Sequence, residues 1–89
     1  MRVQKQKTMT ESQRYKQNKI IFASSCVESA ARKLGISSSD MYQRMKKIDF
    51  IKNFIFKCYD ALHTQSREHV TEDILGALAI WEEKLSKKQ

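Results

Sequence analysis

Apolar residues recur every three or four positions through most of this chain, which is the spacing of one face of an α-helix. The first such stripe comprises Ile20, Ala23, Val27, Ala30 or Ala31, and Leu34. Thr10 can cap a helix by accepting a hydrogen bond from its first turn, and Gly35 can adopt the left-handed conformation that ends helices. The pattern therefore predicts a first helix that begins after Thr10 at the earliest and ends at Gly35.

A second, shorter helix is predicted from Ser38 to Lys47. Ser37 is a suitable N-cap, and Asp40 in the first turn favours the same start. Met41 and Met45 then face a core with Tyr42 beside them, because residues four positions apart share a helix face. Methionine pairs at this spacing are usually core residues, so we interpret them as packing rather than as a binding feature.

The next segment is dense in aromatic side chains. Asp49 is expected to cap a third helix that runs to Leu62. Its aromatic residues cannot all lie on one narrow stripe; they are Phe50, Phe54, Phe56 and Tyr59. Either this helix is buried on two sides, or part of its surface contacts a partner, and both interpretations remain open.

A polar break from His63 to Ser66 precedes a fourth helix, which Ser66 or Thr71 can cap. Apolar residues recur through this helix: Val70, Ile74, Ala77 or Leu78, Trp81 and Leu85. Gly76 inside the helix costs about 1 kcal/mol relative to alanine, which suggests close packing against a neighbour. Trp81 is the expected anchor of the core, and its truncation to alanine should cost about 3 to 5 kcal/mol if it is buried.

Together these segments predict an all-α fold, a small bundle of three main helices plus one short helix. The chain contains no Pro and only two Gly, too few turn residues for several short strands. We expect one helical domain over residues 18–86, a basic and flexible or partly helical arm over 1–17, and a tail over 87–89. The expected core residues are Ile20, Val27, Leu34, Phe54, Leu62, Ile74 and Trp81.

Composition narrows the cellular setting. The net charge is +7, and most of the excess lies in the N-terminal arm. We interpret this arm as a solvated extension, with electrostatic contact to nucleic acid as the alternative. No leader peptide or apolar run of about 20 residues is visible, so we expect a cytoplasmic protein that does not enter a membrane. Cys26 and Cys58 are then expected to be reduced thiols.

Few residues suggest catalysis. The only cluster to weigh as a nucleophile and base or as metal ligands is Cys58, Asp60, His63 and His69. Its spacing matches no zinc pattern, and Cys58 falls on the apolar helix face. The chain has no glycine-rich phosphate loop. The sequence therefore predicts a protein that is not an enzyme and that needs no cofactor or metal.

DNA binding is the alternative with the most support, because the second and third helices could form a helix-turn-helix. The candidate phosphate contacts are Lys46, Lys47 and Lys52, with Arg44 and Lys57 nearby. A recognition helix should present polar side chains to the bases, whereas the third helix presents mainly Phe and Ile. Non-specific contact through the basic arm remains open.

Several stretches of the chain resemble a bacterial family of short proteins of unknown function, DUF3791. They are Asn18-Lys19-Ile20-Ile21-Phe22 with Cys26 and Glu28, Gly35-Ile36-Ser37, the segment from Tyr59 to Ser66, which reads Tyr-Asp-Ala-Leu-His-Thr-Gln-Ser, and Glu72-Asp73-Ile74. The resemblance implies a small helical intracellular protein with a partner-binding or antitoxin-like role. The family has no established activity or functional residues that could be transferred.

The leading hypothesis is a non-enzymatic module that binds a protein partner or itself, and the alternative is a small nucleic-acid-associated protein. The candidate partner surface comprises Phe50, Phe54, Phe56, Tyr59, Asp60, His63, Thr64 and Ser66. The same polar residues could instead form a structural junction, in which Asp60 bonds His63 or the first amides of the last helix. The sequence favours the junction over the surface.

Overall fold

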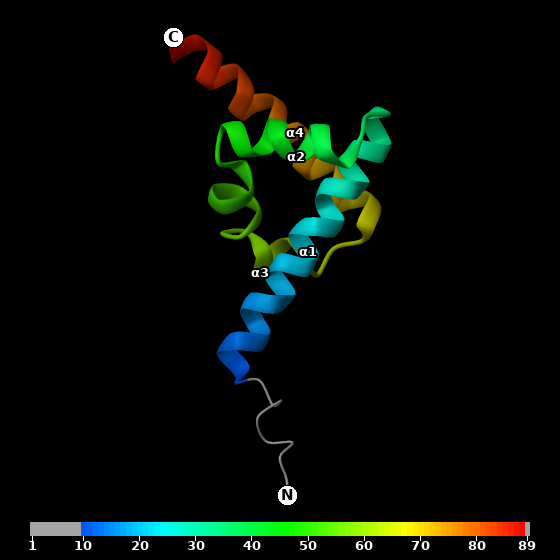
Figure 1. The fold of residues 1–89 in the computed structure, drawn as a ribbon, viewed down its shortest axis with the longest axis vertical. Coiled ribbons are helices and arrows are strands. Elements are labelled where there is room, and N and C mark those ends of the chain that lie inside the picture. The colour runs from blue at the N-terminus through cyan, green and yellow to red at the C-terminus, as the bar shows by residue number, and fades with distance from the viewer. Residues whose placement is uncertain (1–9, 89) are drawn as a thin grey trace, which may run out of the picture.

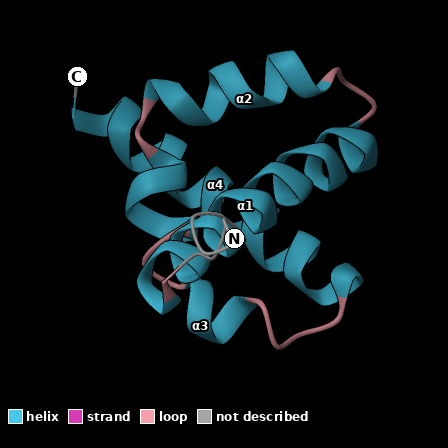
Figure 2. Cartoon of the chain, turned by 60° about the horizontal axis from the view of Figure 1, so that its bottom comes forward, coloured by secondary structure: helices cyan, strands magenta, loops and turns pink. Residues whose placement is uncertain are grey.

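The computed structural model describes residues 10–88, and this part of the chain consists of helices and short connections without strands (Figure 2). Residues 1–9 and 89, which include half of the predicted arm and the end of the predicted tail, lie outside the described residues. The all-α prediction is confirmed. No helix of the described part is long and apolar enough to cross a membrane.

The first helix, α1 (Glu11–Leu34), begins at the earliest start that the sequence allows and ends at Gly35, as predicted. The hydroxyl of Thr10 accepts a hydrogen bond from the amide of Gln13, whose side chain accepts one from the amide of Thr10 in return. Gly35 ends the helix with a φ of 71°. The first turns of α1 extend beyond the other helices along the longest dimension of the molecule (Figure 1).

The short helix α2 (Ser38–Lys47) also has its predicted bounds, with Ser37 as its N-cap. Met41 and Met45 are fully buried and pack against α1 and the helix that ends the chain. That helix is α4 (Arg67–Lys88), and Ser66 caps it by accepting from the amide of His69. Arg44 of α2 donates two hydrogen bonds of 2.6 and 2.9 Å to the Glu82 carboxylate of α4. This bidentate ion pair raises the pKa of Arg44 and ties the two helices together.

The predicted third helix is not one continuous α-helix. It is divided into a π-helix, η2 (Ile51–Ile55), and a single turn, α3 (Tyr59–Leu62). Asp49 does not cap it, because Asp49 has a φ of 55° and the residue before η2 is Phe50. A π-helix brings residues five positions apart onto one face, whereas on an α-helix they diverge by about 140°. Phe50 and Ile55 are such a pair, and both are fully buried.

The core differs from the predicted one at both ends of the α1 stripe. Val27, Leu62 and Ile74 are buried as expected, and Phe54 and Trp81 are half-buried. Ile20 is 58% exposed and Leu34 is 45% exposed, so their assignment to the core is wrong. The buried part of α1 runs only from Ala23 to Ala31, because α2 and α4 cover the middle of the helix and not its ends.

Gly76 does not pack closely against a neighbouring element, contrary to the sequence-based inference. It is exposed on α4, and a β-carbon added at this position would meet no atom within 4 Å. The glycine therefore lowers the helix stability without allowing any close contact within the described part of the chain.

Gly76→Ala is expected to stabilise the protein by about 0.5 to 1 kcal/mol, because alanine loses less backbone entropy in a helix. Thermal denaturation followed by circular dichroism should show a midpoint several degrees higher. Gly35→Ala is the control, since its φ of 71° strains any L side chain, and it should lower the midpoint. A lower midpoint for Gly76→Ala would contradict the open environment of this residue.

Candidate functional site

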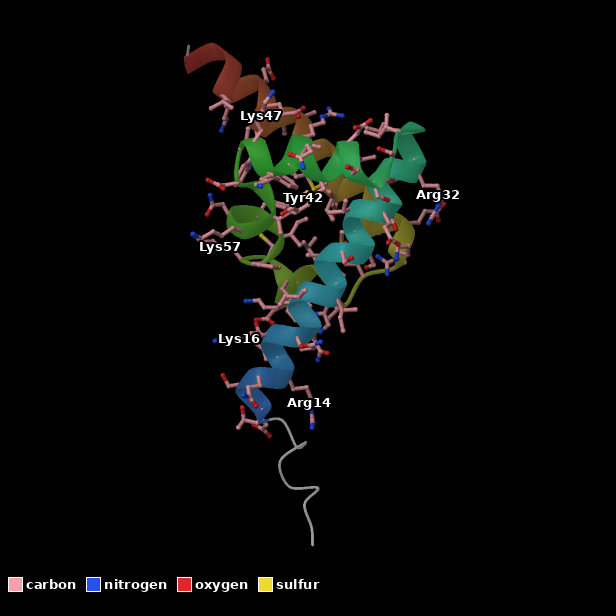
Figure 3. All side chains as sticks on the ribbon, viewed as in Figure 1. Arg14, Lys16, Arg32, Tyr42, Lys47 and Lys57 are labelled. Carbon is pink, nitrogen blue, oxygen red and sulfur yellow. The ribbon has the colours of Figure 1, made fainter. Side chains whose placement is uncertain are left out.

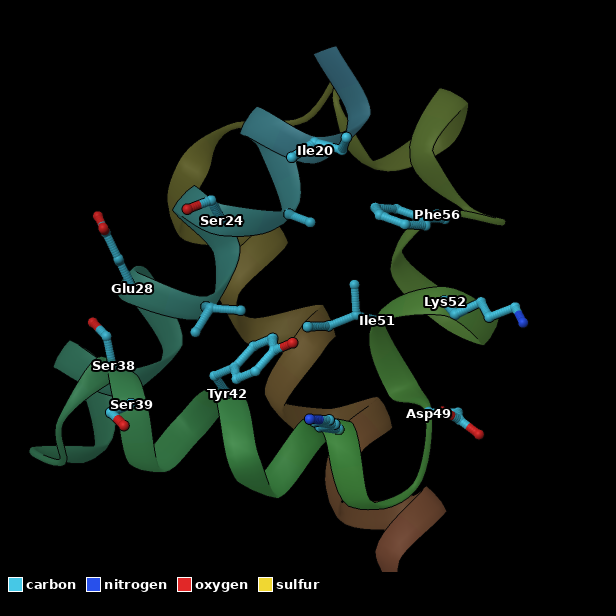
Figure 4. A pocket seen from close by; sticks show the side chains of 13 residues that line it. Ile20, Ser24, Glu28, Ser38, Ser39, Tyr42, Asp49, Ile51, Lys52 and Phe56 are labelled. Atoms are coloured by element: carbon cyan, nitrogen blue, oxygen red, sulfur yellow. The ribbon is translucent and has the colours of Figure 1, made fainter. Parts of the chain in front are cut away.

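A groove with a volume of about 650 Å³ lies between α1, α2 and η2. We call it the α1–α2 groove. Its lining residues are Ile20, Ala23, Ser24, Val27, Glu28, Ser38, Ser39, Tyr42, Lys46, Asp49, Ile51, Lys52 and Phe56. Figure 4 shows Tyr42 and Ile51 directed toward the interior from two sides, with Ile20 and Phe56 at one end.

The interior of this groove is apolar, and part of it is open to solvent. Ile20 is 58% exposed and Tyr42 is 44% exposed, although both are large side chains that proteins tend to bury. The exposure of Ile20 has a structural cause, because it continues the Ala23 and Val27 stripe of α1 past the segment that the other helices cover. Ala23 and Val27 are buried at the floor of the groove, and only the Ile20 end of this α1 stripe is left without a helix on it.

Charged and hydroxyl side chains border the apolar interior. Glu28, Ser38 and Ser39 lie together on one side of the groove (Figure 4). Asp49, in the turn before η2, and Lys52 of η2 point away from the interior (Figure 4). An apolar centre with a polar rim is the usual composition of a protein-binding surface.

Most of the aromatic residues predicted as a partner surface pack against other side chains of the fold. Phe50 is fully buried, and its ring stacks on Phe54 with centroids 4.9 Å apart. Both rings contact the edge or face of Trp81 on α4, at 5.2 and 5.9 Å. On this side the segment is buried against α4, so Phe50 and Phe54 pack the core and do not line the groove.

The second aromatic group joins α3 to α1. Tyr59 is buried and contacts the rings of Tyr15 and Phe22 edge-on, at 5.6 and 5.4 Å. The segment is therefore buried on two sides, which is the first of the two interpretations that the sequence left open. Phe56 is the one member of the predicted aromatic surface that lines the α1–α2 groove.

The predicted polar junction exists, but its bonds differ from those expected. Asp60 accepts a 2.8 Å hydrogen bond from the hydroxyl of Tyr15, which raises the pKa of that phenol, so the expected bond from Asp60 to His63 or to the helix amides is wrong. His63 stacks on Tyr59, with Nδ1 2.9 Å from the Tyr59 carbonyl oxygen. Thr64 donates to the carbonyl of Ala61. With Ser66 as the α4 cap, these residues connect helices and do not converge on a ligand.

The three lysines predicted as phosphate contacts are all exposed. Lys46 and Lys52 line the α1–α2 groove on different elements, and Lys47 ends α2. Arg44, also considered at this site, is paired with Glu82. Labelled basic residues lie on opposite sides of the molecule, with Lys16 and Lys57 on one side and Arg32 on the other (Figure 3).

The residues considered for catalysis do not form a reactive or metal-binding cluster within residues 10–88. Both cysteines are free thiols, and within residues 10–88 no three His, Cys, Asp or Glu side chains are placed to hold a metal ion. Burial raises the pKa of the Cys26 thiol to about 11, despite the opposing charge of Arg67. A thiol with that pKa is a poor nucleophile at neutral pH.

Sequence reasoning missed Ile20, Tyr42 and Ile51 as groove residues. One signal was available, because Ile20 and Ile21 are adjacent and diverge by about 100° on a helix. Both cannot face the same core, and the structure leaves both more than half exposed. No comparable signal marks Ile51, whose direction depends on the π-helical turn.

Comparison with curated proteins and with solved structures finds no match. A protein family described as "Protein of unknown function (DUF3791)" matches residues 21–80, which include η2, α2, α3 and most of the α1–α2 groove. The resemblance seen in the sequence is thereby confirmed. The chain belongs to the DUF3791 family.

Proposed function

We propose that this protein is a non-enzymatic interaction module that binds a protein partner through the α1–α2 groove. The observation that carries the proposal is the apolar groove of about 650 Å³ in which Ile20 and Tyr42 are left 58% and 44% exposed. In a molecule this small, exposed large apolar side chains around a hollow are a typical binding surface.

Other features support binding rather than catalysis. The polar residues from Tyr59 to Ser66 connect and cap helices. The raised pKa of Cys26 makes this buried thiol a poor nucleophile. The groove interior is apolar and its lysines stand at the border, which favours a protein partner over a nucleic-acid duplex that needs a basic face. A cytoplasmic, partner-binding role of this kind includes the antitoxin-like role that the family resemblance implies.

The test is photo-cross-linking in cells that produce the protein, with a benzophenone amino acid in place of Tyr42. We expect an adduct with another protein, because Tyr42 would lie inside the contact. Ile20→Asp should reduce the adduct about tenfold or more, since burying one isoleucine contributes about 1.5 to 3 kcal/mol.

Ile21→Asp is the matched control for this experiment. Ile21 is the next residue of the same helix and is 57% exposed, yet it does not line the groove. Its variant should keep the adduct. If no protein adduct forms at Tyr42, or if both variants reduce it equally, the groove is not the binding surface.

A further inference from the structure

We infer that the partner segment in the α1–α2 groove is an amphipathic α-helix whose apolar stripe is flanked by Glu or Asp. This inference rests on the proposed function and adds the chemistry of the partner. Three features carry it: the spacing of side chains along α1, the small residues between them, and the charge at the end of the groove formed by Ile20 and Phe56.

The α1 wall has the form of a helix-packing surface. Ile20, Ala23 and Val27 line the groove from consecutive turns, over a length of about 10 Å. Exposed Ser24 lies in the middle of that length beside buried Ala23, and small side chains there allow another helix axis to approach closely. Tyr42 and Ile51 complete the sides of the groove (Figure 4). A helix with apolar residues at positions i, i+4 and i+7 fits this arrangement.

One end of the groove is basic. Two of its lysines are on α1 and a third follows Phe56 in the chain, and we call them the basic end: Lys16, Lys19 and Lys57. Lys16 lies one turn before Ile20, and the ammonium group of Lys19 is 5.9 Å from the centre of the Phe56 ring. Lys57 follows Phe56 in the chain, and Figure 3 places it on the same side of the molecule as Lys16.

The acids near the basic end do not neutralise it. Asp60, which accepts a hydrogen bond from Tyr15, is one acid against the three lysines of the basic end, and Asp49 points away from the groove interior (Figure 4). The opposite border holds Glu28 with two serines. A partner helix with carboxylates beside its apolar stripe is therefore complementary in charge to this end.

The same charges disfavour a second copy of this chain as the occupant. A twofold dimer places the same patch of both copies together, and the lysines of the groove and its basic end outnumber the acids that line the groove, Glu28 and Asp49. The chain carries a net charge of +7, which adds a general repulsion between copies. An acidic helix from a different protein meets no such repulsion.

The inference can be tested with the whole protein as bait and a displayed library of helical peptides. The peptides keep leucine at i, i+4 and i+7 and carry random residues on both flanks. We expect the selected peptides to carry Glu or Asp on the flanks and to lose binding to Ile20→Asp. Neutral or basic flanks, or equal binding to Ile20→Asp and the unchanged protein, would overturn the inference.

Charge-reversal variants distinguish the effect of the basic end on peptide binding from the effect of the protein's net charge. For one selected peptide, made synthetically, Lys16→Glu with Lys57→Glu should weaken binding about tenfold, mainly by slowing association, and the loss should shrink at high salt. Arg32→Glu with Lys33→Glu changes the net charge equally but lies away from the groove, and should weaken binding less than about twofold. Equal losses for both pairs would overturn the assignment. If the first pair does not fold, the milder Lys16→Gln with Lys57→Gln is measured instead.

The cross-linking result at Tyr42 and a sedimentation measurement distinguish failure of this inference from failure of the proposed function. A groove-dependent adduct at Tyr42 that maps to a segment without acidic flanks retains the protein-binding function and rejects the acidic helix. A dimer in sedimentation that Ile20→Asp dissociates assigns the groove to a second copy and likewise rejects it. Absence of any groove-dependent adduct rejects both.

Discussion

Phe50→Ala is expected to be the most destabilising single truncation in this protein, with a loss of about 3 to 5 kcal/mol of unfolding free energy. Phe50 is the largest fully buried side chain. It stacks on Phe54 and contacts Trp81 edge-on, so its removal leaves a cavity between η2 and α4 and breaks two ring contacts. Aromatic pairs of this kind add about 0.5 to 1.5 kcal/mol beyond the area they bury.

Chemical denaturation monitored by circular dichroism measures this loss. Trp81 is the core anchor that the sequence predicts. Trp81→Ala should lower the unfolding free energy by less than Phe50→Ala, because Trp81 is only half-buried. Since the total stability of a small domain can be as low as about 5 kcal/mol, Phe50→Leu provides a milder variant that keeps most of the volume. A larger loss for Trp81→Ala than for Phe50→Ala would contradict the burial order of the two residues.

Tyr42→Ala is the matched control on the groove side. Its ring is 44% exposed, so truncation should cost less than about 1 kcal/mol of stability. The same change should weaken partner binding if the groove is the site. The two aromatic residues thus separate the two roles that the sequence could not tell apart, packing at Phe50 and recognition at Tyr42.

The parts of the fold that could be predicted from the sequence are those set by local chemistry. The bounds of α1 and α2 follow from Thr10, Gly35 and Ser37, whose hydrogen bonds involve residues within one turn. The cap of α4 follows in the same way from Ser66, one of two candidates. Capping requires no knowledge of where other helices lie.

The errors occur where one helix meets another. Ile20 continues the apolar stripe of α1, and periodicity cannot show that no element covers it. Asp49 has the composition of a helix cap, but the positive φ at this residue results from the turn that joins α2 to η2. Tyr15 lies in the basic arm, 45 residues from its hydrogen-bond partner Asp60, so no local pattern relates the two.

The candidate site illustrates the same limit. Sequence reasoning correctly marked the segment from Phe50 to Tyr59 as overloaded with aromatic residues, and the structure shows where most of them go. The π-helical turn directs Phe50 and Ile55 to the core while Ile51 and Phe56 line the groove. π-helical turns are frequent at functional sites, and here the turn forms one wall of the proposed binding surface.

The second large effect is expected at alkaline pH, where Cys26 should make the protein less stable as the pH rises from about 9 to about 11. The thiol is buried among α1 and α4 residues, and burial raises its pKa from 9.0 to about 11. Over this interval the unfolded chain releases the thiol proton and the folded chain retains it, so the unfolded state binds fewer protons and unfolding becomes more favourable. A difference of two pKa units corresponds to about 3 kcal/mol lost above pH 11, and none is lost below pH 9.

Other groups titrate in the same range, so the measurement is a difference between variants. Unfolding free energies of the unchanged protein, Cys26→Ala and Cys26→Val are determined by urea titration at several pH values from 7 to 11. Both variants should lose stability less steeply than the unchanged protein above pH 9, whatever their stability at pH 7. Alanine leaves a small cavity and valine fills it, so a shared change of slope can only come from removal of the thiol. If the three slopes are parallel, the thiol ionises equally in both states, and Cys26 is more accessible to water than its position between α1 and α4 implies.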